Sequence, residues 1–119
     1  DFVGAHAEKA DFRGCDLRDT NYSEVHATAA RFDLARLGKS RWQSAELRAA
    51  SLQHAQARWA DFSQANLEAA DLRDGDFSGA NFHAVVDVHT IWTRAILHGA
   101  SQTDPALARA QRARPNASP

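Results

Sequence analysis

The chain repeats every five residues, from its first residue to about residue 100. Every fifth residue counted from Phe2 is apolar in nineteen of twenty cases, and the exception is Asp87. Every fifth residue counted from Ala5 is small or β-branched. A period of five matches neither the 3.6-residue repeat of an α-helix nor the alternation of a flat strand. The pattern therefore predicts a solenoid, in which each repeat buries its apolar side chains by stacking on its neighbours.

The residues within each repeat follow a fixed order, which is clearest between residues 60 and 82. Three successive units read Ala60-Asp61-Phe62-Ser63-Gln64, Ala65-Asn66-Leu67-Glu68-Ala69 and Ala70-Asp71-Leu72-Arg73-Asp74. This order resembles the A(D/N)LXX unit of the pentapeptide-repeat family, and the resemblance covers about 100 of the 119 residues. It implies an all-β fold, a right-handed quadrilateral parallel β-helix of about five coils with one pentapeptide on each side.

The sizes of the interior residues support four repeats per coil. Residues twenty apart would then stack, and one such column is entirely aromatic. Its members are Phe2, Tyr22, Trp42, Phe62 and Phe82. The column on the opposite side also holds only large residues, and alanines at this position occur only on the two remaining sides. Such sorting fills a narrow interior without voids.

The β-helix is expected to span residues 1–100 and to be followed by a short capping α-helix over 101–113. Asp104 suits the N-cap and Pro105 the first helical position, and the following residues are good helix formers. Residues 114–119 are expected to form a disordered tail. The chain contains no methionine and starts inside a repeat, so we interpret it as a domain excised from a longer protein.

The residue after each small interior residue should point outward and lie beside its equivalents in the neighbouring coils. This placement predicts charge-balanced ladders in which Arg31 meets Asp11, Arg36 meets Asp16 and Arg41 meets Asp61. Exposed pairs of this kind contribute about 0–1 kcal/mol each. The single cysteine, Cys15, falls at a small interior position and is expected to be a buried structural thiol.

A candidate partner surface comprises Arg36, Lys39, Arg58 and Trp59, which the four-sided arrangement brings to one side. A large aromatic residue is uncommon at an outward corner such as that of Trp59. Contact with a partner or a phosphate backbone is one interpretation. The other is that the indole simply lies over the arginine side chains.

A candidate cap or dimer surface lies on the last coil, where outward positions become apolar. Its members are Val86, Val88, Ile91, Ile96 and Leu107. An apolar exterior needs a cover, which either the predicted helix or a second copy of the chain would supply. Asp87 breaks the pattern in the same coil; because an unpaired interior charge is costly, this side is expected to open or the carboxylate to turn toward backbone N–H groups.

No catalytic, cofactor or metal site is expected. His6, His26 and Glu46 share an outward column and are suitable ligand types for zinc, but their side chains are expected to run parallel rather than converge. No nucleophile–base pair can be identified, and a filled interior leaves no concave pocket for a substrate. We therefore predict that the protein is not an enzyme.

The function predicted from the sequence is a non-catalytic protein–protein interaction or scaffold module from a larger bacterial protein. The segments Trp92-Thr93-Arg94-Ala95 and Thr103–Ala110 resemble the end of pentapeptide domains in type VI secretion accessory proteins. The alternative is a DNA mimic that binds DNA gyrase, although eleven basic and fourteen acidic residues in 1–100 give only a weak negative charge. With a net charge of −1, no long apolar run and no signal peptide, we expect a cytoplasmic protein with no membrane partner and no nucleic-acid partner.

Overall fold

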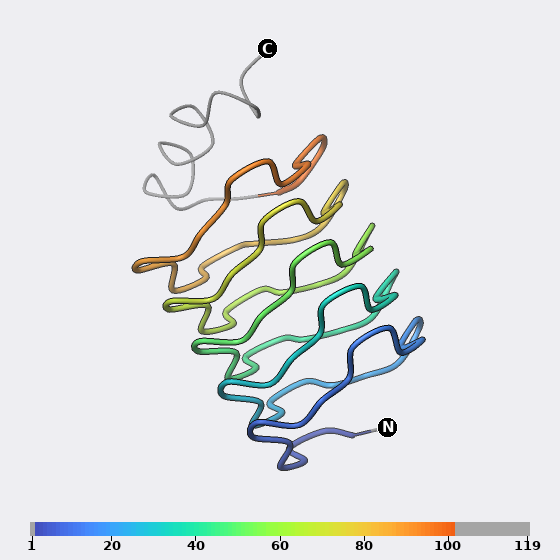
Figure 1. Cartoon of the computed structure of the whole chain (residues 1–119), viewed down its shortest axis with the longest axis vertical. Coiled ribbons are helices and arrows are strands. Elements are labelled where there is room, and N and C mark those ends of the chain that lie inside the picture. The colour runs from blue at the N-terminus through green and yellow to red at the C-terminus, as the bar shows by residue number, and fades with distance from the viewer. Residues whose placement is uncertain (1, 102–119) are drawn as a thin grey trace.

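The computed structural model describes residues 2–101, which wind into five stacked coils of twenty residues (Figure 1). Within these residues the structure has no helix, and no strand is longer than a single bridged residue. Bridged residues recur every five positions from His6 to Ser101, and turns at residues 3–4, 8–9 and so on to 98–99 separate them. Each bridge is parallel and joins residues twenty apart, so the four-sided coil predicted from the sequence is confirmed. Apart from residue 101, the predicted capping helix and tail lie outside the described residues.

Backbone hydrogen bonds hold each coil to the next, and the side around Asp11 shows the pattern. The amide of Phe12 donates to the carbonyl of Arg31 over 2.7 Å, and the amide of Arg31 donates to the carbonyl of Ala10 over 2.9 Å. These are the slanted bonds of a parallel ladder. A further bond from the amide of Cys15 to the carbonyl of Phe12, 3.0 Å long, closes the corner. The same bonds recur along the stack and satisfy the backbone that each corner would otherwise expose.

Every corner places one residue in the left-handed backbone region. All twenty such residues have φ between 58° and 72°, and only four of them are glycine. Side chains as different as those of Leu34, Lys39 and Trp59 occupy this position. A non-glycine residue there costs roughly 1–2 kcal/mol, so the ladder bonds and the packed interior must outweigh a strain that recurs at sixteen corners.

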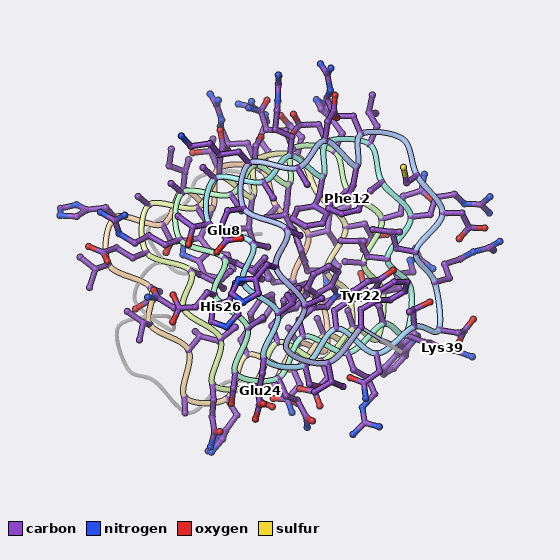
Figure 2. All side chains as sticks on the ribbon, turned by 90° about the horizontal axis from the view of Figure 1, so that it is seen from below. Glu8, Phe12, Tyr22, Glu24, His26 and Lys39 are labelled. Atoms are coloured by element: carbon purple, nitrogen blue, oxygen red, sulfur yellow. The ribbon has the colours of Figure 1, made fainter. Side chains whose placement is uncertain are left out.

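The interior of the central coils is filled by a stack of buried side chains. Along the aromatic column the ring centroids lie 5.3, 4.5, 6.4 and 5.4 Å apart, with planes within 17° of parallel. Figure 2 looks along the stack and shows Phe12 and Tyr22 inside the coils, with Lys39 at the rim. The indole nitrogen of Trp42 donates to the hydroxyl of Ser40 over 2.7 Å, so the polar group of this fully buried side chain is satisfied. The predicted column and its period are therefore confirmed.

The first coil is less covered than the central ones because no described coil lies below it. A hollow of about 250 Å³ opens at this end, lined by residues that include Phe2, Phe12 and Leu17. Phe2 is 52% exposed. Cys15 is also exposed, so the prediction of a buried thiol is wrong: its interior position has a covering coil on one side only.

The last described coil contains the one polar residue of the apolar series. Asp87 is half-buried, and its carbonyl accepts a hydrogen bond of 3.3 Å from the amide of Thr90.

No helix in the described part of the chain is long and apolar enough to cross a bilayer.

Candidate functional site: an arginine-lined groove

One side of the β-helix carries a groove of about 390 Å³. Its lining comes from four successive coils and comprises Arg18, Arg36, Gly38, Gln56, Arg58 and Asp76. Bridges place Arg36 and Gln56 beside each other in the centre, between Asp16 in the first coil and Asp76 in the fourth. The groove is therefore built on backbone that the bridges between coils hold in place.

Gly38 creates the hollow because it has no side chain, whereas the residues twenty positions before and after it do. Arg18 precedes it by twenty residues and Arg58 follows it by twenty, so two arginines flank a position with no side chain. A Cβ atom built on Gly38 would lie 3.8 Å from Cγ of Arg18 and 3.7 Å from the carbonyl oxygen of Arg58. These are ordinary contact distances, so the glycine is not required for the backbone, and its lack of a side chain leaves the space open.

The three arginines of the groove differ in how far their charges are neutralised. Arg18 Nη2 lies 2.7 Å from Asp16 Oδ2, and Arg58 Nε lies 2.7 Å from Asp76 Oδ2. Arg36, between them and exposed, makes no hydrogen bond or ion pair through its guanidinium with any residue in the range 2–101. Its charge acts on Asp16, as a minor cause of the lowered pKa of that carboxyl, but no carboxylate takes up its hydrogen-bond donors, so these are available to an anion from outside.

Arginine side chains perturb the two carboxyl groups at the edges of the groove. The Arg18 side chain donates to Asp16 and is the largest cause that lowers the pKa of this carboxyl to about 2. Burial by itself would raise the pKa of Asp76, but hydrogen bonds from Ser78 and Arg58 outweigh it and the pKa is lowered. Both groups are therefore ionised at neutral pH, and each neutralises the arginine it contacts.

The predicted ladder pairs lie side by side as bridge partners but form no direct ion pair within residues 2–101. Arg31 and Arg36 still contribute by their charge to the lowered pKa of Asp11 and of Asp16. The carboxylates of Asp11 and Asp16 bind Arg13 and Arg18, which lie two residues further along the same coil. The same carboxylates also accept the backbone amides of these arginines, as in an Asx turn. The corner thus brings residue i+2 closer to the carboxylate than the arginine in the next coil.

The structure brings Arg36 and Arg58 of the predicted partner surface together in the groove. Lys39 and Trp59 do not line it; they lie at the adjoining corner, in the left-handed position that follows Gly38 and Arg58. Trp59 is 65% exposed. Its indole lies against Gly79, since a Cβ on that residue would be only 2.4 Å from Cε3 of Trp59. The indole therefore covers bare backbone instead of arginine side chains.

Sequence reasoning did not identify Arg18, Gly38, Gln56 and Asp76 as part of this surface. The twenty-residue period carried the signal, because reading that column gives arginine, glycine and arginine in succession at Arg18, Gly38 and Arg58. The column of Arg18, Gly38 and Arg58 thus shows a gap between two arginines that the predicted partner surface did not include.

The apolar residues of the last coil are exposed but do not form one flat patch. Exposed fractions are 45% for Val86, 51% for Val88, 39% for Ile91 and 44% for Ile96. Bridges to Asn66, Asp71 and Asp76 place Val86, Ile91 and Ile96 on three successive sides of the coil. They form a belt around the β-helix, so a single flat interface cannot cover them all. Leu107, assigned to the same surface, lies outside the described residues.

Comparison with known proteins identifies the repeats. The sequence model described as a pentapeptide repeat region matches residues 5–82. Among curated protein sequences, none matches the chain significantly.

Solved structures with this fold include a pentapeptide repeat protein from the thylakoid lumen of Arabidopsis thaliana, with a TM-score of 0.88 and 24% identity over 93% of this chain and 77% of that one. Rfr23 from the cyanobacterium Cyanothece 51142 has a TM-score of 0.68 and 22% identity over 79% of this chain, which spans only 60% of Rfr23. QnrB1, a plasmid-mediated fluoroquinolone resistance protein, has a TM-score of 0.50 and 16% identity over 92% of this chain and 82% of that one. At these identities the similarity concerns the fold alone. Together with the residues matched by the sequence model, it shows that the chain belongs to the pentapeptide repeat family and folds as a right-handed quadrilateral β-helix.

Proposed function

We propose that this chain is a non-catalytic protein-interaction module that docks an acidic segment of a partner protein in the arginine-lined groove. The observation that carries the proposal is the arrangement around Gly38, where Arg18 and Arg58 flank a hollow with Arg36 at its centre. A guanidinium binds a carboxylate through two parallel hydrogen bonds, and Arg36 has no carboxylate partner among the described residues. The exposed Trp59 at the adjoining corner offers the partner an aromatic surface of the kind enriched at interfaces.

A non-catalytic role agrees with the shape of the molecule. Enzymes bind their substrates in concave sites with several converging polar groups. Here Phe62, Phe77 and Phe82 pack against one another and fill the interior. The outer sides are rigid ladders suited to presenting side chains at fixed spacing.

Several finer parts of the proposal rest on the sequence alone. A role in type VI secretion depends on a motif whose second segment, Thr103–Ala110, lies outside the described residues. A longer bacterial parent protein, a cytoplasmic location and a homodimer through the last coil likewise remain predictions.

The competing function is a DNA mimic that binds DNA gyrase, and the positions of the arginines argue against it. Arg31, Arg36 and Arg41 occupy three successive sides of the second coil. They place a positive band across faces that a DNA mimic would need to keep acidic. A gyrase supercoiling assay with this chain added at low salt tests the alternative directly: inhibition at micromolar concentration would favour mimicry over the groove.

The groove itself is tested by titrating a short polyglutamate peptide at low salt and following peptide anisotropy. We expect Arg36→Glu to weaken binding about tenfold or more, because one exposed charge pair contributes up to about 1 kcal/mol and its reversal adds a repulsion of similar size. The matched control is Arg31→Glu, since Arg31 occupies the same exposed ladder position on the neighbouring side of the same coil.

A second variant tests the hollow without changing the charge. Gly38→Leu fills the space between Arg18 and Arg58 and should abolish peptide binding while the fold remains intact, because a Cβ at this position makes only ordinary contacts. Equal loss of binding in the Arg36 and Arg31 variants, or unchanged binding in Gly38→Leu, would show that the groove is not the docking site.

A further inference from the structure

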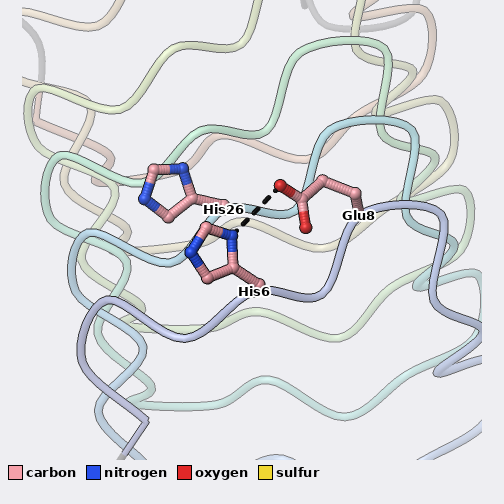
Figure 3. Close-up of side chains that lie close together, drawn as sticks. All are labelled: His6, Glu8 and His26. Carbon is pink, nitrogen blue, oxygen red and sulfur yellow. Dashed lines mark hydrogen bonds and ion pairs between the residues drawn. The ribbon is translucent and has the colours of Figure 1, made fainter.

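Two histidines on neighbouring coils form a stacked pair on one side of the β-helix. His6 and His26 are bridge partners, so their side chains leave the same side twenty residues apart. Their imidazole rings stack with centroids 4.5 Å apart and planes 11° from parallel (Figure 3). Both side chains are exposed. The pair therefore presents ring nitrogens from two coils to the same region of solvent.

A carboxylate joins this pair from the corner that follows the first histidine. Glu8 folds back so that its Oε2 lies 3.3 Å from Nδ1 of His6 (dashed line in Figure 3). One nitrogen from each imidazole and one oxygen of Glu8 all lie within 4.8 Å of one another.

The carboxylate beside the two histidines is that of Glu8, not that of Glu46, which shares their outward column in the sequence. Glu46 continues that column beyond His26, but its Oε1 accepts a hydrogen bond of 3.3 Å from the amide nitrogen of Asn66. Glu8 lies two residues after His6 and outside the column of residues twenty apart, so the column did not predict it. Two imidazoles and one carboxylate now come from two coils and meet at one place.

We propose that His6, Glu8 and His26 form a binding site for a divalent transition-metal ion such as Zn²⁺. Two histidines and one glutamate are a known ligand set for zinc that leaves a fourth position open, and imidazole nitrogen suits the later first-row metals. Bonds of about 2.0–2.2 Å in tetrahedral geometry require ligand atoms about 3.4 Å apart. The ligand atoms must therefore move closer by up to about 1.4 Å from their largest separation of 4.8 Å, which rotation of the exposed imidazoles out of their stack provides. Water or a group from a partner completes the coordination.

The position of the site gives the metal a structural consequence. Its ligands join the first coil to the second, at the end where Phe2 is 52% exposed and Ala5 and Ala7 are only partly buried. A metal that binds the folded chain and not the unfolded one stabilises the fold by mass action. Here the stabilisation acts between two specific coils, so it should slow local opening of the first coil more than opening of the central ones.

Isothermal titration of the protein with Zn²⁺ near pH 7.5 tests the site. We expect one ion per chain, with binding weakened about tenfold or more by His6→Ala, by His26→Ala and by Glu8→Gln. Loss of an outer partner of a metal ligand already costs 10–100-fold in affinity, so loss of a ligand should cost at least as much. His98→Ala, which removes an exposed histidine from the last coil, is the control and should bind as the wild type does.

Hydrogen exchange with and without Zn²⁺ tests the cross-link between coils. The amides of Ala7 and Lys9 donate to carbonyls of the second coil over 2.7 and 2.9 Å. Their exchange should slow about tenfold in the wild type with Zn²⁺ and remain unchanged in His26→Ala. The proposal is overturned if no saturable binding of one ion occurs, if the double variant His6→Ala/His26→Ala binds as tightly as the wild type, or if slowing is equal in wild type and His26→Ala.

Discussion

The indole of Trp59 lies against the backbone of Gly79, the residue that occupies the same corner one coil further along. A Cβ atom on Gly79 would approach three ring carbons of Trp59 to between 2.4 and 2.7 Å. The contact depends on Gly79 because a side chain there would collide with the indole. The backbone at this position also favours glycine, because its φ is +71°. The exposed indole thus lies in space that is open because residue 79, in the next coil, has no side chain.

Replacing this glycine should displace the indole. We expect Gly79→Ala to lose about 1–2 kcal/mol of stability through the left-handed backbone and to shift tryptophan emission to longer wavelength as the ring swings into solvent. Urea denaturation and fluorescence measure the two effects.

Gly14→Ala separates backbone strain from contact with the ring. Gly14 has the same φ of +71°, but a Cβ there would meet nothing within 4 Å. It should lose similar stability with no spectral change. Unchanged emission in Gly79→Ala would mean that the indole does not lie on the glycine in solution.

Substitution by glycine should stabilise the protein at corners where a non-glycine residue has positive φ. Ala49 is exposed and has φ of 59°. Ala49→Gly relieves roughly 1–2 kcal/mol of strain and gives back about 0.4–1 kcal/mol through the more flexible unfolded chain. We expect a net gain of about 0–1.6 kcal/mol in the free energy of unfolding, measured by urea denaturation.

The adjacent residue provides the comparison for this substitution. Ala50 is 1% exposed and lines the interior, so Ala50→Gly removes a packed methyl group and should lose about 1 kcal/mol. If the two variants destabilise equally, the corner residues are not strained.

The inward and outward positions can be tested by one large residue placed at each. Ala65 is fully buried, and Ala65→Phe should overpack the interior at a cost of about 1–3 kcal/mol or more. Ser63 lies at a half-buried outward corner, so Ser63→Phe should be nearly neutral in thermal denaturation. Equal effects at the two sites would contradict the observed orientation of the side chains.

Acid should destabilise the first coil through Asp11. Hydrogen bonds from the Arg13 side chain and backbone lower the pKa of this carboxyl from 3.8 to about 2. Because the folded pKa lies below the unfolded one, its contribution to stability is present above about pH 4 and is lost as the pH falls toward 2. NMR titration of the Asp11 carboxyl should give a pKa of about 2 in the wild type.

Arg13→Gln removes the side-chain charge and should raise the pKa of Asp11 toward 3.8. The same variant should flatten the dependence of stability on pH between about 4 and 2. The pKa of Asp16, whose partner is Arg18, should stay low. A pKa near 3.8 for Asp11 in the wild-type protein would show that the pair does not persist in solution.

The fold could be predicted from the sequence because the interior residues of the repeats determine it. A period of five and the sorting of aromatic residues into one column leave few alternatives to four sides, and the stacked rings from Phe2 to Phe82 confirm it. The exposure of Cys15 was missed because the repeat describes an infinite stack, whereas within residues 2–101 the first coil is covered from one side only.

The candidate site was only partly predictable because it depends on how the corner places side chains. Sequence columns pair Asp16 with Arg36, but the turn brings Arg18 closer and leaves Arg36 without a carboxylate partner in the range 2–101. The hollow at Gly38 and the approach of Glu8 to His6 arise in the same way. Each involves a corner residue, whose side-chain direction follows from backbone angles that the repeat pattern does not specify.

The bridge between residues twenty apart also limits how such a chain can change in length. An insertion of one residue would exchange inside for outside in every later repeat. An insertion of five would keep the interior apolar but turn the rest of the β-helix by a quarter, so Trp42 would no longer stack on Phe62 and the Gly38 hollow would lose Arg58 as its far wall. Only a gain or loss of twenty residues preserves every face. Evolution could therefore lengthen this molecule in whole coils far more readily than in single repeats.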